Sequence, residues 1–141
     1  MQNQEISVVL DTNVVVSAAV SSEGNPAKIF ETLINGRVKN YTSDEIMAEI
    51  KDVMNRERIK RAIGEKDKSF IIENFEKLSE KIIPQDKYEE VKDDPKDNKF
   101  LDCAVAAGAS YIVSGDEHLL KLKEFKGIKL VSPAEFIELI S

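Results

Sequence analysis

The chain has 141 residues, of which 42% are hydrophobic and 33% are charged, and its formal net charge is −6 at pH 7. This length suffices for one domain with its own core, and the composition excludes a disordered chain. One cysteine and one histidine exclude a disulfide framework and a multi-thiolate or multi-histidine zinc site. Any bound metal is therefore expected to be a hard cation with oxygen ligands.

The N-terminal region lacks the pattern of a signal peptide. Its apolar stretches Ile6–Leu10 and Val14–Val20 are separated by polar residues, and no apolar run approaches the roughly 18 residues that cross a bilayer. We therefore expect a cytoplasmic protein with no membrane partner. The negative charge argues against binding of nucleic acid by bulk electrostatics, but not against action on nucleic acid through bound cations.

Short apolar segments alternate with helical patterns along the chain. The sequence predicts strands at 5–10, 38–41, 81–83, 111–113 and 129–131. It predicts helices at 25–35, 43–55, 56–63, 66–80 and 97–108, a short helix at 117–123 and a closing helix at 133–140. Residues 85–96 are expected to form an acidic loop or a ragged helical turn. This alternation predicts one α/β domain over residues 1–141, with a mostly parallel sheet of about five strands covered on both faces. Ligands of such sheets bind at the carboxyl ends of the strands.

Aspartates directly follow two of the expected buried strands. Asp11 comes after the first strand, in VVLDTN, and Asp116 comes after the strand at 111–113, in YIVSGD. An aspartate at such a place often caps the next helix, and capping alone is the alternative role for each. Because the strands are parallel, both carboxylates are expected at the same edge of the sheet, where ligands bind.

Asp97 is expected to point toward the same edge. On a helical wheel of roughly 100° per residue, it lies near the middle of the apolar face that includes Phe100 and Leu101. An N-cap is the alternative role, but an N-cap does not require an inward-facing side chain. Asp102 falls off this apolar face and is expected at the surface. The segment DDPKDN lacks the glycine and glutamate of a calcium loop, so that type of site is excluded.

Glu49 is a fourth acidic candidate. It lies at the margin of its helix's apolar face, three residues after Ile46, and its side chain leans toward the helix N-terminus, again at the carboxyl edge. A solvent-exposed glutamate is the alternative. Glu45 has a structural explanation, because Thr42-x-x-Glu45 fits a capping box.

Several inward-facing carboxylates repel one another, which raises their pKa values or requires a cation. One or two Mg²⁺ or Mn²⁺ ions meet this requirement, because hard divalent cations prefer carboxylate oxygen. Such a site binds phosphate oxygen and activates water. Asn13 and Ser114 add neutral polar groups nearby, with turn or cap chemistry as their alternative role. Cys103 is expected to be a small buried thiol, and His118 a surface residue.

Three segments make the sequence similar to a known family, namely VVLDTNVVVSA, SDEIMAEIKDVM and DDPKDNKFLDCAVAAGASYIVSGDEHLL. Over nearly the whole chain they resemble the PIN-domain ribonucleases, and among these the VapC-like toxins of bacterial and archaeal toxin–antitoxin systems. The resemblance implies a three-layer α/β/α domain that cleaves single-stranded RNA with Mg²⁺ or Mn²⁺. It carries the family's acidic quartet onto Asp11, Glu49, Asp97 and Asp116, and it matches Asn13 and Ser114 to supporting positions.

We therefore expect a metal-dependent endoribonuclease, the toxin of a toxin–antitoxin pair. Asp11, Asp97 and Asp116 would be the principal metal ligands, and Glu49 would bind directly or through water. The expected partners are single-stranded RNA, a cognate antitoxin protein and a second copy of the chain in a homodimer. The helices at 66–80 and 133–140 offer apolar faces for such partners, and core packing is the alternative for both.

A locally basic segment follows the helix of Glu49. Residues 56–68 hold six basic side chains against three acidic ones. Its first four basic residues are candidate contacts with the RNA backbone: Arg56, Arg58, Lys60 and Arg61. A solvated helix face is the alternative.

Two other interpretations of the carboxylates stay open. An acidic-pocket phosphotransfer domain would be phosphorylated on Asp11 and would not cleave RNA. A non-catalytic α/β binding module would use the carboxylates as helix caps only. It would bind no Mn²⁺ and would change little on substitution Asp97→Asn.

Overall fold

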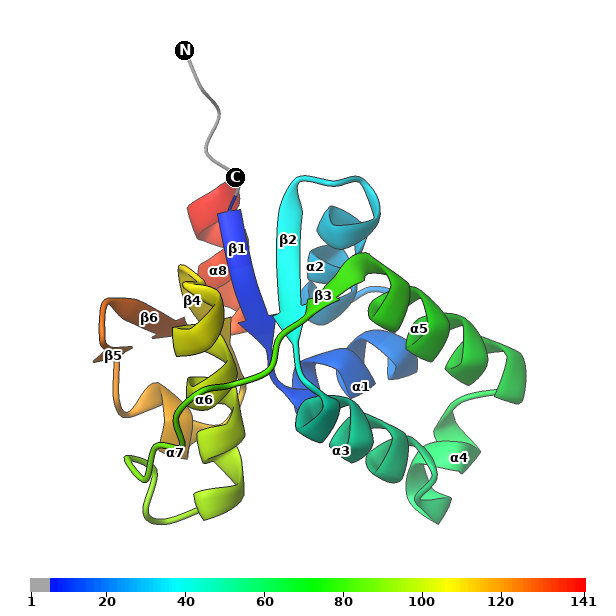
Figure 1. Cartoon of the computed structure of the whole chain (residues 1–141). Helices are drawn as coiled ribbons and strands as arrows, with labels where there is room; N and C mark the ends of the chain where they lie inside the picture. Colours follow the sequence, from blue (N-terminus) through cyan, green and yellow to red (C-terminus); the bar gives the residue numbers. More distant parts are fainter. Residues whose placement is uncertain (1–5) are drawn as a thin grey trace.

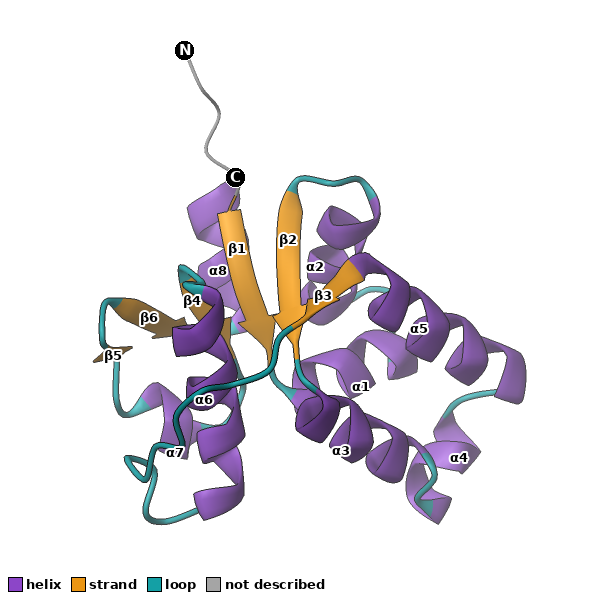
Figure 2. Ribbon diagram, viewed as in Figure 1, coloured by secondary structure: helices purple, strands orange, loops and turns teal. Residues whose placement is uncertain are grey.

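The structure, a computed structural model, describes residues 6–141. Helices cover both faces of a central sheet (Figures 1 and 2). The sheet has the strand order β3-β2-β1-β4-β6-β5. Its strands are β1 (Ile6–Leu10), β2 (Val38–Thr42), β3 (Ser79–Lys81), β4 (Tyr111–Val113), β5 (Glu124–Phe125) and β6 (Ile128–Val131). All neighbouring pairs are parallel except β5 with β6, which confirms the predicted fold class.

The helices connect these strands and flank the sheet. They are α1 (Thr12–Val20), α2 (Asn25–Ile34), α3 (Asp44–Met54), α4 (Glu57–Ala62), α5 (Glu65–Leu78), α6 (Asn98–Ala107), α7 (Glu117–Leu120) and α8 (Pro133–Ile140), with a 3₁₀ turn η1 (Pro95–Asp97) directly before α6. α6 packs against β1, β2 and β4, in front of the sheet in Figure 1, while α2 and α8 lie behind it. Within residues 6–141, every helix is too short or too polar to cross a membrane.

The sequence pattern does not predict α1. Its sequence TNVVVSAAV is buried on several sides, and a helix that is apolar all round has no amphipathic period. The predicted strand at 81–83 is also displaced, because β3 begins at Ser79, directly where α5 ends. The ladder still continues beyond β3, since the Ile82 amide donates to the Thr42 carbonyl at 2.8 Å.

The sheet has six strands, where about five were expected. The additional strand, β5, has only two residues and pairs with β6 through a tight turn. Lys126 and Gly127 form this turn with φ values of 50° and 84°. Two positive φ values are typical of a hairpin turn that favours Asn-Gly, so Lys-Gly gave only a weak signal in the sequence.

Two predictions about polar residues are wrong. Asp102 is buried rather than solvated, because residues of the loop before η1 cover it and the Tyr88 amide donates to its carboxylate at 2.7 Å. The capping box at Thr42 and Glu45 does not form. Ser43 is the N-cap of α3, and Thr42 is the last residue of β2. Cys103 is fully buried, as predicted.

The parallel arrangement brings several chain segments to one edge of the sheet. The carboxyl ends of β1, β2 and β4 lead into α1, α3 and α7, and η1 leads into α6 beside them. Beneath this edge the core is closed by large buried side chains that include Leu10, Ile46, Phe100 and Ile112. The polar residues at the start of these helices are therefore positioned by a closely packed core.

Candidate metal centre

A pocket of about 170 Å³ lies beyond the carboxyl ends of β1 and β4. The structure brings to it all four acidic residues predicted from the sequence, together with a fifth. The pocket is lined by Asp11, Glu49, Asp94, Asp97 and Asp116, by Thr12, Asn13, Val53 and Phe100, and by the basic side chains Arg56 and Lys96.

Asp11 lies at the base of the pocket, directly after β1, and is 2% exposed. Its Oδ1 accepts from the Val14 amide at 2.9 Å, so it caps α1, and its Oδ2 accepts from the Ser114 hydroxyl. Burial raises the pKa of Asp11 to about 6, although these hydrogen bonds lower it. The buried Asp11 carboxylate thus depends on donors that the protein supplies.

Asp116 follows β4 and is half-buried. Its Oδ1 accepts from the His118 amide at 2.7 Å and caps α7. The Ser114 hydroxyl oxygen also accepts from the Asp116 amide at 2.9 Å. Ser114 therefore links Asp11 to the backbone of Asp116, and the capping role expected for both aspartates is present beside any other role.

Asp97 is a buried acidic residue of the pocket, and one oxygen of its carboxylate has no hydrogen-bond donor within residues 6–141. It is 8% exposed, makes no capping hydrogen bond to α6, and its Oδ2 has no partner among the described residues. Burial first, and then the neighbouring carboxylates of Asp116, Asp94 and Asp11, raise the pKa of Asp97 to about 8. A buried carboxylate oxygen without a donor, facing other carboxylates, fits a divalent cation.

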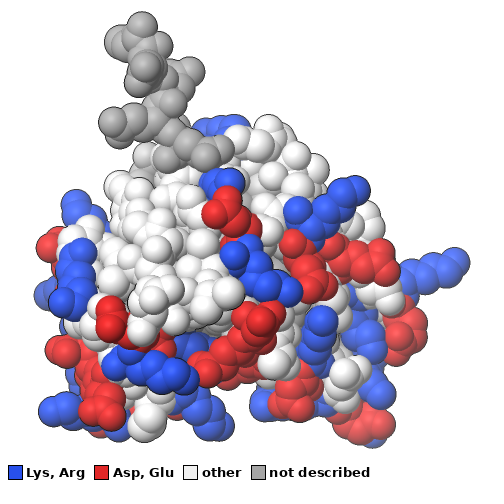
Figure 3. Space-filling view, in the orientation of Figure 1, with Lys and Arg blue, Asp and Glu red and all other residues white. Residues whose placement is uncertain are grey.

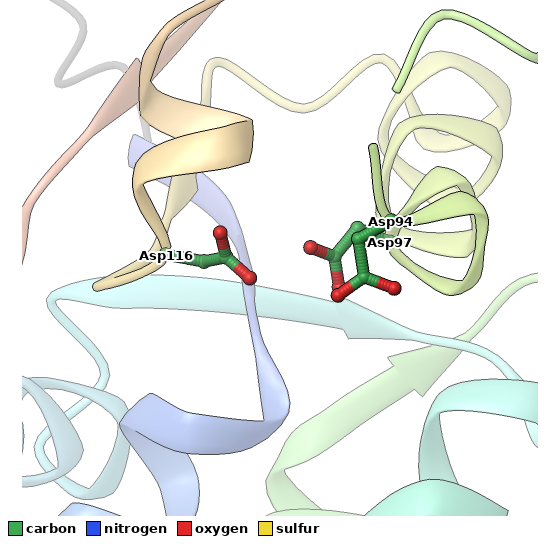
Figure 4. A group of neighbouring side chains, drawn as sticks. All are labelled: Asp94, Asp97 and Asp116. Carbon is green, nitrogen blue, oxygen red and sulfur yellow. The ribbon is translucent and has the colours of Figure 1, made fainter. Parts of the chain in front are cut away.

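Asp94 is the residue that the sequence interpretation missed. Asp94, Asp97 and Asp116 each offer one carboxylate oxygen, and these three oxygens lie within 4.8 Å of one another (Figure 4). Asp94 precedes η1 and Asp97 ends it, and side chains three residues apart eclipse one another in a 3₁₀ helix. The spacing D-x-x-D around Pro95 is the signal that could have identified Asp94.

Glu49 reaches the same pocket from α3, but it is already paired. Its Oε1 accepts from the Thr12 hydroxyl, and its Oε2 accepts from the Lys99 ammonium at 2.8 Å. Lys99 is 7% exposed and also donates to the Lys96 carbonyl at 2.7 Å. The pairing of Lys99 with Glu49 was not expected from the sequence.

The basic candidates are distributed unevenly around the pocket. Arg56 lines it and forms an ion pair with Asp52 at 3.5 Å. Arg58, Lys60 and Arg61 are exposed on α4, outside the pocket lining. Figure 3 shows acidic and basic side chains interspersed over the lower half of one face, without a continuous basic surface there.

Comparisons with known proteins identify the family of the chain. The PIN domain family model matches residues 7–118. The chain is 31% identical over 147 aligned positions to the uncharacterized protein MJ1680 of Methanocaldococcus jannaschii, which covers 98% of this chain and 94% of that protein.

Two solved structures share the fold. PAE2754 from Pyrobaculum aerophilum superposes with a TM-score of 0.66 at 11% identity, covering 96% of this chain and 90% of that one. A chain of VapBC2 from Rickettsia felis, crystallised with a DNA fragment from its promoter, gives a TM-score of 0.58 at 15% identity, covering 90% of this chain and 98% of that one. From the family match and the relative in Methanocaldococcus jannaschii, we conclude that the chain belongs to the PIN domain family.

Proposed function

We propose that this protein is a metal-dependent endoribonuclease that cleaves single-stranded RNA. The observation that carries the proposal is the buried Asp97 oxygen without a hydrogen-bond donor, which lies in one group with oxygens of Asp94 and Asp116. A bound cation would neutralise the negative charge of such a group, because isolated buried charges are strongly disfavoured. Membership of the PIN domain family supports the same activity.

Asp97 and Asp116 would be the principal ligands of Mg²⁺ or Mn²⁺, with Asp94 as an additional one. Asp11, predicted from the sequence as a further ligand, would support them from the base of the pocket through its hydrogen bond with Ser114. A divalent ion held there supplies Lewis-acid activation of water and neutralises charge on the phosphate. Ser114 orients the site by its bonds to the Asp11 carboxylate and the Asp116 amide. Since the pocket lining contains no histidine, a pocket carboxylate is the group available to accept the proton of the attacking water.

RNA would be held mainly through its backbone. Arg56 and Lys96 stand in the pocket lining beside the carboxylates, and Arg58, Lys60 and Arg61 continue outward along α4. Basic side chains of this kind bind phosphate oxygens. Phe100 is the one aromatic residue of the pocket lining, so base stacking contributes little.

The test uses a labelled single-stranded RNA of mixed sequence, with and without Mn²⁺. We expect Mn²⁺-dependent cleavage by the wild type and by Asp93→Asn, an exposed control beside the site. Asp97→Asn should be slower by about 100-fold or more, as expected for the loss of a group that acts on the transition state. Equal cleavage by Asp97→Asn and the wild type would reveal a contaminating nuclease and contradict the proposal.

Phosphotransfer through Asp11 has less support. Both oxygens of Asp11 accept hydrogen bonds, and the side chain is 2% exposed, so neither oxygen is free to attack a phosphoryl group. A purely structural role for the carboxylates is compatible with Asp11 and Asp116, which both cap helices. It does not account for Asp97, which caps none.

We further propose that the protein is the toxin of a toxin–antitoxin pair and forms a homodimer. The shared fold with a VapBC2 chain supports the first part. Phe70 on α5 and Leu139 on α8 are each 54% exposed, and these two helices are where we expect the protein contacts. Light scattering of the purified chain tests the dimer. Co-purification with the product of a small neighbouring gene tests the antitoxin, and a monomer that binds no such product would contradict both.

A further inference from the structure

Lys99 puts a fixed positive charge beside the acidic pocket. It is the second residue of α6, and its side chain is almost completely buried. Its ammonium group donates to Glu49 at 2.8 Å and to the Lys96 carbonyl at 2.7 Å. A lysine is seldom buried without a charged partner, so Lys99 and Glu49 form a mutually dependent pair.

Glu49 has a donor on each of its two oxygens. Thr12, the first residue of α1, donates to Oε1, and Lys99 donates to Oε2. Thr12 on α1 and Lys99 on α6 together hold the Glu49 carboxylate of α3 in one orientation. An oxygen that accepts a strong hydrogen bond offers less electron density to a metal ion, and each Glu49 oxygen already accepts such a bond from the protein itself.

The five pocket carboxylates therefore fall into two groups. Glu49 is compensated by an ammonium group, and Asp11 is engaged by an amide and a hydroxyl. Asp94, Asp97 and Asp116 form the second group, in which the His118 amide donates to Asp116 and one buried oxygen of Asp97 has no donor in the described part of the chain. A divalent ion fits this second group, whereas an ion at Glu49 would meet the like charge of Lys99 at close range.

We propose that Lys99 takes the place of a second metal ion. The pocket then binds one divalent ion through Asp94, Asp97 and Asp116, and Glu49 is a positioning residue that does not coordinate it directly. This inference rests on the proposed function, because it assumes that the pocket binds metal at all.

The first test counts Mn²⁺ ions on the full-length chain by calorimetric titration, with electron paramagnetic resonance of free Mn²⁺ as a second measurement. We expect one ion per chain. Asp94→Asn should weaken binding by about tenfold or more, since even outer-sphere groups are commonly worth this much, while its neighbour Asp93→Asn should not. Glu49→Gln should leave the affinity within about threefold, because the glutamine oxygen still accepts from Lys99 while its NH₂ group donates to the Thr12 hydroxyl oxygen.

The second test removes the charge of Lys99. Lys99→Met keeps an unbranched side chain without the ammonium group, and we expect a second Mn²⁺ to bind at the uncovered Glu49. Lys99→Arg should remain at one ion, as should Lys96→Met, which removes an exposed lysine of the same pocket. The double variant Lys99→Met/Glu49→Gln should return to one ion. It also provides a charge-matched chain if the single variant fails to fold.

The outcomes separate the two proposals. A wild type that binds two ions, a Glu49→Gln variant that weakens binding as much as Asp94→Asn does, or a folded Lys99→Met variant that stays at one ion would overturn the role of Lys99. None of these three results would contradict the proposed function of a metal-dependent nuclease. A wild type that binds no Mn²⁺ would overturn both.

Discussion

The Ser114 hydroxyl donates to the Asp11 carboxylate across 103 positions of the sequence. The two residues follow the neighbouring parallel strands β4 and β1, and the same hydroxyl oxygen accepts from the Asp116 amide. One fully buried side chain thus fixes two of the acidic residues of the pocket relative to each other.

Ser114→Ala should weaken Mn²⁺ binding and RNA cleavage by about 10- to 100-fold, the usual effect of removing a group that orients a metal ligand. The substitution should also raise the pKa of Asp11 further, because the Ser114 hydrogen bond lowers it. Mn²⁺ titration of the variant at several pH values measures both effects. Ser114→Thr, which keeps the hydroxyl, is the control, and equal Mn²⁺ affinity in all three proteins would show that the contact does not orient the site.

Asp97→Asn should stabilise the protein in the absence of metal while removing its response to metal. Asp97 is buried, one of its oxygens has no donor among residues 6–141 and its pKa is raised to about 8, so at neutral pH and above the fold disfavours its ionised form, which an asparagine cannot adopt. We expect a gain of about 1–3 kcal/mol in the free energy of unfolding, the usual penalty of an unsatisfied buried group. Urea denaturation in EDTA measures it, with Asp93→Asn as the surface control. An Asp97→Asn variant that is less stable than the wild type would contradict this prediction and indicate that the carboxylate has a structural role.

The metal-free protein should lose stability as the pH rises. Asp11 and Asp97 have pKa values raised from 3.8 to about 6 and about 8, so the folded state holds their protons more tightly than the unfolded state does. The stabilisation from these two groups is complete below about pH 4 and is lost as the pH passes through about 6 and then about 8.

Saturating Mg²⁺ should offset this loss, because the ion binds the deprotonated carboxylates. Thermal unfolding between pH 5 and pH 8, with Mg²⁺ or with EDTA, measures the difference. The two melting curves should coincide near pH 5 and separate toward pH 8. Parallel pH profiles under the two conditions would mean that these carboxylates do not bind the ion.

Asp102→Ala should loosen the loop between β3 and η1, which carries Asp94 at its end. Tyr88 in this loop donates its amide to Asp102, and its ring packs edge-on against Phe125 with centroids 5.2 Å apart. Loss of a buried acceptor costs about 1–3 kcal/mol, and limited proteolysis should cut the loop faster. Asp86→Ala, at an exposed position of the same loop, is the control. Unchanged cleavage of the Asp102→Ala loop would show that other contacts hold it.

The sequence could predict those parts of the fold and site that depend on local patterns. Strand-terminal aspartates such as Asp11 and Asp116 are visible because buried strands are short apolar runs with sharp ends. The inward orientation of Asp97 follows from the period of the helix predicted at 97–108, although the structure places Asp97 at the end of η1. These three acidic residues lie in the same pocket because parallel strands share a carboxyl edge.

The remaining features depend on contacts between distant segments or on unusual local geometry. The ion pair of Lys99 with Glu49 joins α6 to α3 across 50 positions, and no periodicity encodes it. Asp94 joins the site because the segment before α6 is a 3₁₀ turn rather than an α-helix. Asp102 lies on the polar face of its helix, and only the covering loop buries it.

The binding of a divalent ion by the pocket is tested most directly by crystals of the protein grown with Mn²⁺ and measured for anomalous scattering. We expect an anomalous peak bound to carboxylate oxygens of Asp97 and Asp116, at about 2.0–2.3 Å as is usual for small divalent cations, with Asp94 in the same coordination sphere and Lys99 still paired with Glu49. A pocket without an anomalous peak at saturating Mn²⁺, or a peak at another place on the molecule, would contradict the account.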